Sequence, residues 1–146
     1  MARPIHASHF MLVLALEGTV IAFYDAQAIY YGKELWCPPP INGCNEVANS
    51  PYARLFDVPV GYFGIVYYLS IFALAVLMEL HSSSRALRIG VLLYAALGVS
   101  FSIYFFYVQV SYIHAFCIYC LVSAVTTLML LAAACLNVEK NPAIPG

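Results

Sequence analysis

The sequence predicts an all-α integral membrane protein: a four-helix bundle with an outward-facing capping loop that contains a short helix. Two observations lead to this fold class. Hydrophobic residues make up 64% of the 146 residues and charged residues only 9%, whereas a soluble domain carries about 25% charged residues. The apolar residues also gather in four runs, each close to the ~20 residues that a helix needs to cross a bilayer. We expect one domain over residues 1–146.

The four runs define the expected membrane-spanning helices, which lie at about residues 10–31, 60–80, 86–110 and 114–136. The long connection, residues 32–59, is the expected outer loop. Its second half, residues 45–56, is predicted to form a short helical piece lying on the membrane surface. The side chains expected to face the membrane there are Val47, Tyr52, Leu55 and Phe56.

The distribution of basic residues predicts the orientation. With four spans, both termini and the turn at residues 81–85 share one side of the membrane. That side holds four basic residues, and the other side holds Lys33 and Arg54. Basic residues favour the cytoplasmic side, so both termini are expected in the cytoplasm of a cell (inner or plasma) membrane, with the outer loop facing outward. The net charge of −1 makes nucleic acid an unexpected partner.

This topology sorts the five cysteines, which are Cys37, Cys44, Cys117, Cys120 and Cys135. The first four gather at the outer face, where disulfides persist. Cys135 falls at the opposite end of the fourth helix, where we expect a small apolar residue that packs without reacting.

Cys117 and Cys120 form a C-x-x-C motif that is expected in the first turn of the fourth helix. Two sulfurs three residues apart on a helix share a face and lie within disulfide reach. The helix N-terminus also favours a reactive thiolate. An unreactive pair is the alternative, and the second cysteine pair on the same face weighs against it.

Four cysteines can also bind zinc. The Cys37–Cys44 spacing is wider than that of usual zinc ligands, the prolines between them are stiff, and the outer face is oxidising. We therefore expect no metal and favour thiol–disulfide exchange between the two pairs. Four cysteines allow three pairings, and a relay uses more than one of them. With no flavin motif in the chain, the electrons need a lipid-soluble acceptor, and a quinone beside the fourth helix fits that need.

The stretch from Cys44 to Ala53 (CNEVANSPYA), the Val58-Pro59-Val60 entry to the second span, and Cys117-Ile118-Tyr119-Cys120 resemble the vitamin K epoxide reductase (VKOR) family. The resemblance is closer to its prokaryotic single-domain members. It implies an oxidoreductase in which a four-helix bundle holds a quinone near the outer face. By the same resemblance, Cys37 and Cys44 meet the partner protein, Cys44 exchanges with Cys117, and Cys120 delivers electrons to a quinone of the ubiquinone or menaquinone type.

The resemblance also implies which residues surround the quinone. Ser50 matches a polar residue near the quinone, although a cap of the loop helix before Pro51 is an equal alternative, and Tyr52 is expected beside it. Val60 and Ala124 stand where vertebrate members place an asparagine and a tyrosine. These two differences favour plain quinone reduction over epoxide reduction.

No fused thioredoxin-like domain is expected, so the implied electron donor is a separate thioredoxin-like or DsbA-like protein. The implied role is disulfide formation in exported proteins. Alternatives are quinone or vitamin K epoxide reduction as the main role, a DsbB-type enzyme, and a claudin-like structural tetraspan. A DsbB-type enzyme carries its C-x-x-C in the first outer loop. A claudin-like protein shares a tryptophan beside a cysteine, here Trp36 and Cys37, but has a longer first loop and no need of Cys117 and Cys120.

Three further polar residues fall in or beside the spans. Asp25 is near the outer end of the first span and is expected to be solvated. Glu17 is deeper, and carboxylates at that depth usually have a partner; the candidates are Tyr67, Tyr68 and Gln109. Proton delivery to the reduced quinone is the alternative role of Glu17. His114 is expected to mark the helix end at the interface, with a position over Cys117 as the alternative.

Overall fold

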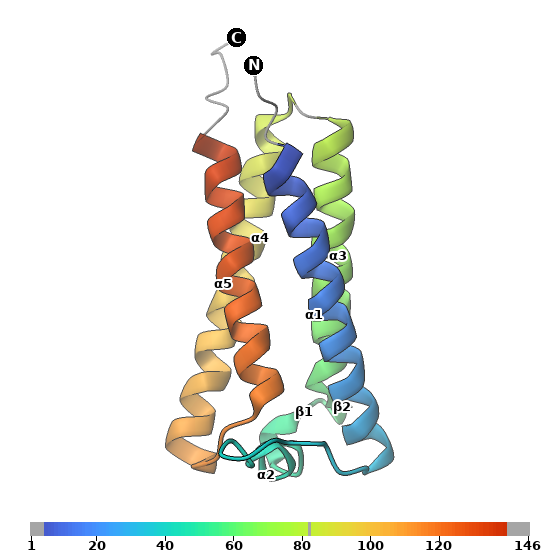
Figure 1. The fold of residues 1–146 in the computed structure, drawn as a ribbon, viewed down its shortest axis with the longest axis vertical. Coiled ribbons are helices and arrows are strands. Elements are labelled where there is room, and N and C mark those ends of the chain that lie inside the picture. Colours follow the sequence, from blue (N-terminus) through green and yellow to red (C-terminus); the bar gives the residue numbers. More distant parts are fainter. Residues whose placement is uncertain (1–4, 82, 140–146) are drawn as a thin grey trace.

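Four long helices form the body of the protein. The computed structural model describes residues 5–81 and 83–139, and in these parts of the chain four helices are long and apolar enough to cross a membrane. They are α1 (Ile5–Tyr31), α3 (Val60–Leu80), α4 (Arg85–Val108) and α5 (Ile118–Glu139). They run side by side, and the connection between α1 and α3 closes one end of the bundle (Figure 1). The predicted all-α membrane bundle is confirmed. We call residues 32–59 the cap.

The helix bounds agree with the sequence prediction for α3 and differ most at α5. After α4 the chain continues through a π-helical turn, η2 (Gln109–Ile113), and His114 then adopts a left-handed conformation with φ of 55°. This conformation ends the helical path. The expected helix start at residue 114 is therefore wrong, and so is the place of Cys117 within the first turn. Cys117 is the N-cap residue of α5, because its carbonyl oxygen accepts a hydrogen bond from the Leu121 N–H at 3.1 Å.

The closest packing in the bundle joins α1 to α3. A stripe of small residues on α1, which includes Gly18, Ala22 and Ala26, faces α3. A methyl group on Gly61 of α3 would lie 2.7 Å from the carbonyl oxygen of Ala22. Small residues permit such close backbone approach in membranes, where helix association depends on van der Waals packing. Tyr68 fills the space over Gly18 and bonds through its hydroxyl to Ser123 Oγ at 2.7 Å, which ties α3 to α5.

The cap is more varied than the single helical piece that the sequence predicted. It contains α2 (Cys44–Ala48), a 3-10 turn η1 (Pro51–Ala53) and a hairpin of β1 (Arg54–Leu55) and β2 (Val58–Pro59). The α-helix ends early because Pro51 disfavours helical geometry in the residue before it. The expected helix over residues 45–56 is therefore only partly right.

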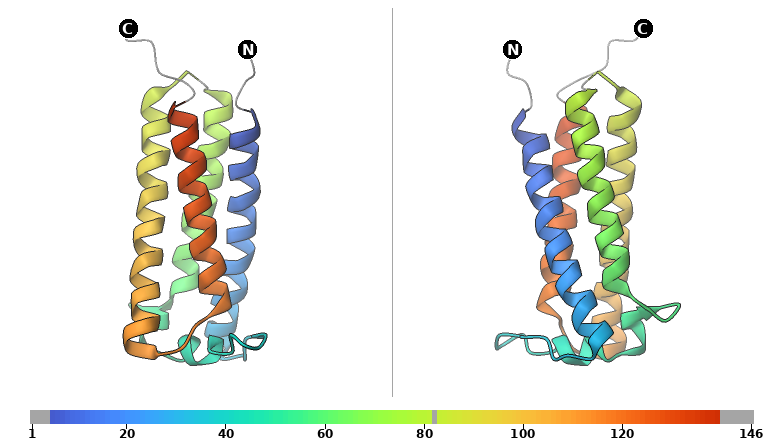
Figure 2. Two further views of the ribbon diagram at one scale, coloured as in Figure 1. Left: turned by 60° about the vertical axis from the view of Figure 1, so that its left-hand side comes forward. Right: turned by 90° about the vertical axis from the view of Figure 1, so that its right-hand side faces the viewer.

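The hairpin turns through Phe56 and Asp57, which have φ of 52° and 62°. Two left-handed residues are the geometry that joins paired strands with the shortest loop. The hairpin projects from the side of the bundle (Figure 2), and Phe56 is 89% exposed at its tip. Arg54 anchors it by donating a hydrogen bond from Nη2 to the Ile29 carbonyl oxygen, at 3.0 Å, near the end of α1.

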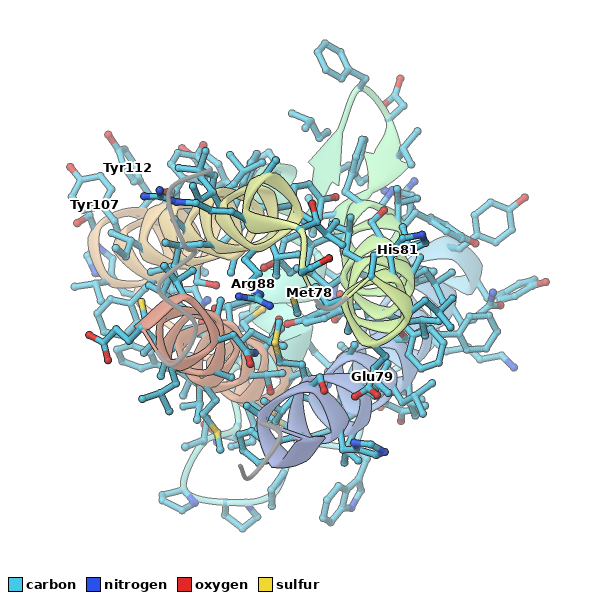
Figure 3. The ribbon with its side chains drawn as sticks, turned by 90° about the horizontal axis from the view of Figure 1, so that it is seen from above. Met78, Glu79, His81, Arg88, Tyr107 and Tyr112 are labelled. Atoms are coloured by element: carbon cyan, nitrogen blue, oxygen red, sulfur yellow. A yellow bond between two sulfur atoms is a disulfide. The ribbon has the colours of Figure 1, made fainter. Side chains whose placement is uncertain are left out.

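The end of the bundle opposite the cap carries a polar cluster. Glu79 on α3 accepts a hydrogen bond from Ser8 and lies 3.3 Å from His9 Nδ1 on α1. Figure 3, which views the bundle from this end, shows Glu79 beside α1, whereas Tyr107 and Tyr112 point away from the bundle. The cluster joins α1 and α3 at the end away from the cysteines.

The α1–α3 contact can be tested by adding one methyl group. Gly61→Ala should lower the free energy of unfolding in detergent by about 1–3 kcal/mol, the usual cost of overpacking. Gly90→Ala in α4 is the matched control, because nothing lies within 4 Å of the added methyl. Its unfolding free energy should stay the same or rise by about 0.5–1 kcal/mol. Equal effects of the two substitutions would contradict the packing described here.

Candidate active site

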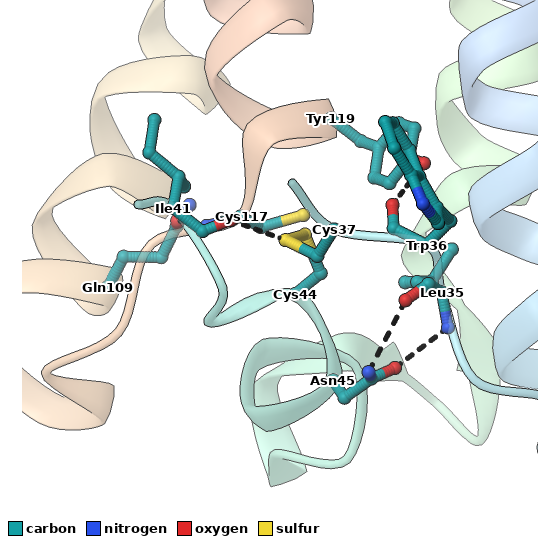
Figure 4. The surroundings of a disulfide bond; sticks show 9 residues. All are labelled: Leu35, Trp36, Cys37, Ile41, Cys44, Asn45, Gln109, Cys117 and Tyr119. Atoms are coloured by element: carbon teal, nitrogen blue, oxygen red, sulfur yellow. Dashed lines mark hydrogen bonds between the residues drawn. A yellow bond between two sulfur atoms is a disulfide. The ribbon is translucent and has the colours of Figure 1, made fainter. Parts of the chain in front are cut away.

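Four cysteines meet where the cap contacts the start of α5. Cys37 and Cys44 form a disulfide with a Cα–Cα distance of 6.0 Å, and Cys117 and Cys120 are free thiols. All four belong to one apolar cluster with Ala28 and Leu35. Figure 4 shows the Cys117 sulfur beside the disulfide. Two pairs far apart in the sequence therefore share one site.

A direct backbone contact holds the cap against the start of α5. A methyl group on Gly43 would lie 2.7 Å from the Phe116 nitrogen and 2.8 Å from its carbonyl oxygen. The φ of Gly43 is −85°, which any residue adopts, so glycine is needed here for space and not for conformation. Because Cys44 follows Gly43 and Cys117 follows Phe116, this contact brings the two cysteines together.

Two side chains fix the segment that carries Cys37. Asn45 accepts a hydrogen bond from the Leu35 N–H at 2.8 Å and donates one to the Leu35 carbonyl oxygen at 3.3 Å. Tyr119 donates from its hydroxyl to the Trp36 carbonyl oxygen at 2.6 Å (Figure 4). The first contact joins the segment to α2 and the second joins it to α5. Residues on both sides of the site therefore hold Cys37 in place.

The surroundings of Cys117 favour its thiolate. A hydrogen bond from the Cys120 thiol lowers the pKa of Cys117 most, and the backbone N–H groups of Cys120 and Tyr119 lower it further. Burial and the charge of Asp25 act in the opposite direction, and the net effect is a lowered pKa. These amides belong to the first turn of α5, where an N-cap group normally accepts. Cys117 is thus the favoured nucleophile of the pair.

Gln109 completes the support of Cys117 from α4. This buried side chain accepts a hydrogen bond through Oε1 from the Cys117 N–H at 2.9 Å. A buried N–H without a partner costs about 1–3 kcal/mol, so Gln109 stabilises the extended chain just before α5. The residue stands at the junction of α4 and the π-helical turn, and such turns occur frequently at functional sites.

A cavity of about 20 Å³ lies next to Cys120, between α1, the cap and α4. This volume is far below the range of small-molecule sites, so the cap and the helices must separate to admit a ring-sized ligand. Three of the four predicted quinone-binding residues, Ser50, Tyr52 and Val60, line it. The fourth, Ala124, does not, because its short side chain lies one turn further along α5. The other residues that line the cavity are Asp25, Ile29, Val47, Ala48, Ala53, Phe105, Val108, Gln109 and Ile113.

The polar groups in this cavity differ from expectation. Ser50 donates to the Val47 carbonyl oxygen at 2.7 Å and makes no side-chain cap to η1, so the alternative of a helix cap is wrong. Val47 lines the cavity instead of facing the membrane surface. Asp25 is half-buried and also faces the cavity, so the expectation of a solvated carboxylate is wrong. The mostly apolar lining with few polar groups matches the chemical character of a weakly polar ring.

The remaining sequence candidates do not line the cavity next to Cys120. Glu17 makes no hydrogen bond to the three expected partners within the described residues, but it interacts electrostatically with Tyr68. Tyr68 bonds to Ser123, Gln109 bonds to Cys117, and the Tyr67 hydroxyl has no partner among the described residues. His114 is exposed and ends the π-helical turn. Cys135 is exposed at the far end of α5. Within residues 5–81 and 83–139, no group of three or more His, Cys, Asp or Glu side chains could hold a metal ion.

The family model of the Vitamin K epoxide reductase family matches residues 9–135, which is most of the chain. The protein belongs to this family. Membership makes it a multi-pass membrane thiol–disulfide oxidoreductase with a quinone-related role, and it removes the claudin-like and DsbB-type alternatives. The comparison with curated proteins found no match.

The contact at Gly43 can be tested by its effect on exchange between the two cysteine pairs. Gly43→Ala should separate the cap from α5 and slow the passage of reducing equivalents from Cys37/Cys44 to an oxidised Cys117/Cys120 pair by about 100-fold, the typical cost of a 1 Å misplacement. Maleimide mass tagging after rapid quenching measures this rate in quinone-free protein. Asn42→Ala, an exposed neighbour, is the control and should exchange at the wild-type rate. An unchanged rate in Gly43→Ala would contradict the role of the contact.

Proposed function

We propose that this protein is a membrane thiol oxidase that passes electrons from a thioredoxin-like partner to a quinone. Cys37/Cys44 receives the electrons, Cys117/Cys120 takes them over, and a quinone in the cavity accepts them. The biological role is disulfide formation in exported proteins. The observation that carries the proposal is the order of the four sulfurs between solvent and the cavity.

That order follows from burial. Cys37 is half-buried, next to Trp36, which is 72% exposed, and it is the cap cysteine that an external thiol can reach. Cys44 and Cys117 are 0% and 1% exposed, which protects exchange between them from outside thiols. Cys120 lines the cavity. Cys37 can therefore meet the partner protein, Cys44 and Cys117 can exchange with each other, and Cys120 can meet the acceptor.

The exchange steps balance in electrons and protons. A partner thiolate attacks Cys37 and releases Cys44, and the second partner thiol then frees Cys37 as the partner's own disulfide forms. Cys44 attacks an oxidised Cys117–Cys120 pair at Cys117, and Cys37 resolves the mixed disulfide. Two electrons and two protons have then reached Cys117 and Cys120. The described sulfurs, a Cys37–Cys44 disulfide with two free thiols on α5, correspond to this stage.

The residues around the cavity support a quinone as the acceptor. Val60, Ile29 and Phe105 form apolar walls of the cavity. Ser50 and Asp25 add polar groups to the same cavity, which Cys120 also lines. A bound quinone supplies a two-electron acceptor of the ubiquinone or menaquinone type. Val60 has no hydrogen-bonding group on its side chain, which favours quinone reduction over epoxide reduction as the main reaction.

The oxidation of exported proteins requires the cysteines on the outer face. Arg85 and Arg88 lie at the end of the bundle opposite the cap, and Lys33 and Arg54 lie at the cap end. We propose that the cap faces outward and that both termini are cytoplasmic, in accord with the distribution of basic residues. The partner would then be a thioredoxin-like or DsbA-like protein of that compartment.

The proposal is tested by quinone reduction with purified protein. In detergent, the wild-type protein supplied with a reduced thioredoxin-like protein should reduce a short-chain ubiquinone or menaquinone, followed by ultraviolet absorbance. Cys120→Ala should lose this turnover because the sulfur next to the cavity is gone. Cys135→Ala removes a cysteine far from the site and should keep the wild-type rate. The proposed path is refuted if the wild-type protein does not reduce the quinone, or if Cys120→Ala keeps full turnover.

A further inference from the structure

Helix α1 carries two carboxylates within the membrane, and they lie in different surroundings. Glu17 is exposed in a groove between α1 and α5 whose lining includes Val125 and Met129 and no cysteine. Asp25 is half-buried and lines the same cavity as Cys120. Of the two carboxylates, it is Asp25 that faces the redox site.

Asp25 has no hydrogen bond or ion pair with any other residue in the described parts of the chain. A carboxylate within a membrane span is costly, and such residues usually face the bundle interior or a cavity and mark substrate pathways or proton relays. No structural contact within the described residues explains the presence of Asp25. Its position in the cavity, beside a thiol that must lose a proton, offers a chemical explanation.

We propose that Asp25 is a catalytic residue that carries a proton from the Cys120 thiol to the quinone. This inference rests on the proposed function and adds the proton path to the electron path. In the reaction, the S–H bonds of Cys117 and Cys120 break and the Cys117–Cys120 disulfide forms. Two electrons and two protons reach the quinone. Asp25 accepts the Cys120 proton, passes it to the nearer quinone oxygen and ends as a carboxylate.

The shared cavity places Asp25 near the cysteine pair, because both Asp25 and Cys120 line it. The charge of Asp25 raises the pKa of Cys117, against the hydrogen bonds from Cys120 and Tyr119 that lower it. The negative charge of Asp25 disfavours a thiolate on the neighbouring cysteines. This effect lasts until the thiol proton and the thiol electrons each have an acceptor. Asp25 is therefore placed to act as a base at the step in which electrons pass from the cysteine pair to the quinone.

Substitution of each carboxylate tests the assignment. Asp25→Asn should reduce quinone turnover by at least about 100-fold, in the range that general acid–base groups contribute. Asp25→Glu should recover part of the rate because it restores the carboxylate. Glu17→Gln removes a carboxylate from the same helix outside the cavity, and it should turn over at the wild-type rate. Equal thermal unfolding temperatures of the variants ensure that the comparison concerns chemistry.

Two measurements that do not depend on turnover separate proton transfer from a structural role. In the first, equilibrium dialysis should find that Asp25→Asn binds a short-chain quinone within about threefold of wild type. In the second, Cys120→Ser and Cys135→Ser leave Cys117 as the one free thiol. Thiolate absorbance at 240 nm should then show that Asp25→Asn lowers the pKa of Cys117, because a nearby negative charge is gone.

The outcomes distinguish this inference from the proposed function. If wild-type protein does not reduce quinone, the proposed function fails. If wild-type protein does so and Asp25→Asn keeps the same rate, only the role of Asp25 is refuted. Loss of quinone binding in Asp25→Asn, or an unchanged pKa of Cys117, would also overturn the assignment. In the first case Asp25 would hold the quinone, and in the second it would lie too far from the sulfurs.

Discussion

The backbone contact between Gly43 and the Ala115–Phe116 segment determines how the two halves of this protein meet. The contact residues Gly43 and Phe116 are 73 residues apart in the chain, and no covalent link joins the cap to α5 in the described redox state. A glycine at the contact allows the backbones to touch. Cys44 and Cys117 then enter the same apolar cluster. Asn45 and Tyr119 hold the cap in place around this contact. Without the contact, they would hold Cys37 at a position with no cysteine of α5 nearby.

The membrane end of the site follows from the same geometry. The cap contacts the residues just before α5, the helix begins at Ile118, and Cys117 stands at the N-cap. Its sulfur then accepts from the first amides of the helix, and its own amide donates to Gln109. Hydrogen bonds are costly to leave unmade in a buried site, so the arrangement is specific. Cys120, three residues on, faces the cavity.

Much of this architecture could be predicted from the sequence because it depends on hydrophobicity averaged over long stretches of the chain. Four apolar runs of bilayer length predict four spans, and chain order alone then places four cysteines at one end and Cys135 at the other. The C-x-x-C spacing predicts two sulfurs on one side of a helix start. These inferences need only hydrophobicity and period, which tolerate errors of several residues in the helix ends.

The details of the site could not be predicted because single contacts decide them. The start of α5 depends on a left-handed His114 and on the Gly43 contact, although the local sequence from residue 114 reads as helix. Val47 and Asp25 face the cavity because the cap folds back over the bundle, which no periodicity reveals. Gln109 looked like a partner for Glu17 since both are polar residues within spans. Its hydrogen-bond partner is the backbone N–H of Cys117. Every residue except proline has such a group, so the sequence does not indicate which one Gln109 binds.

The most direct test of this account is to trap the exchange between the pairs. In Cys37→Ser protein kept oxidised with a short-chain quinone, Cys44 has no resolving partner and should accumulate as a Cys44–Cys117 disulfide, with Cys120 left as a free thiol. Peptide mapping after non-reducing digestion identifies the bond, and Cys44→Ser provides the control in which it is absent. A Cys44–Cys120 disulfide, or no bond between the cap and α5, would contradict the central claim that the cap delivers Cys44 to Cys117.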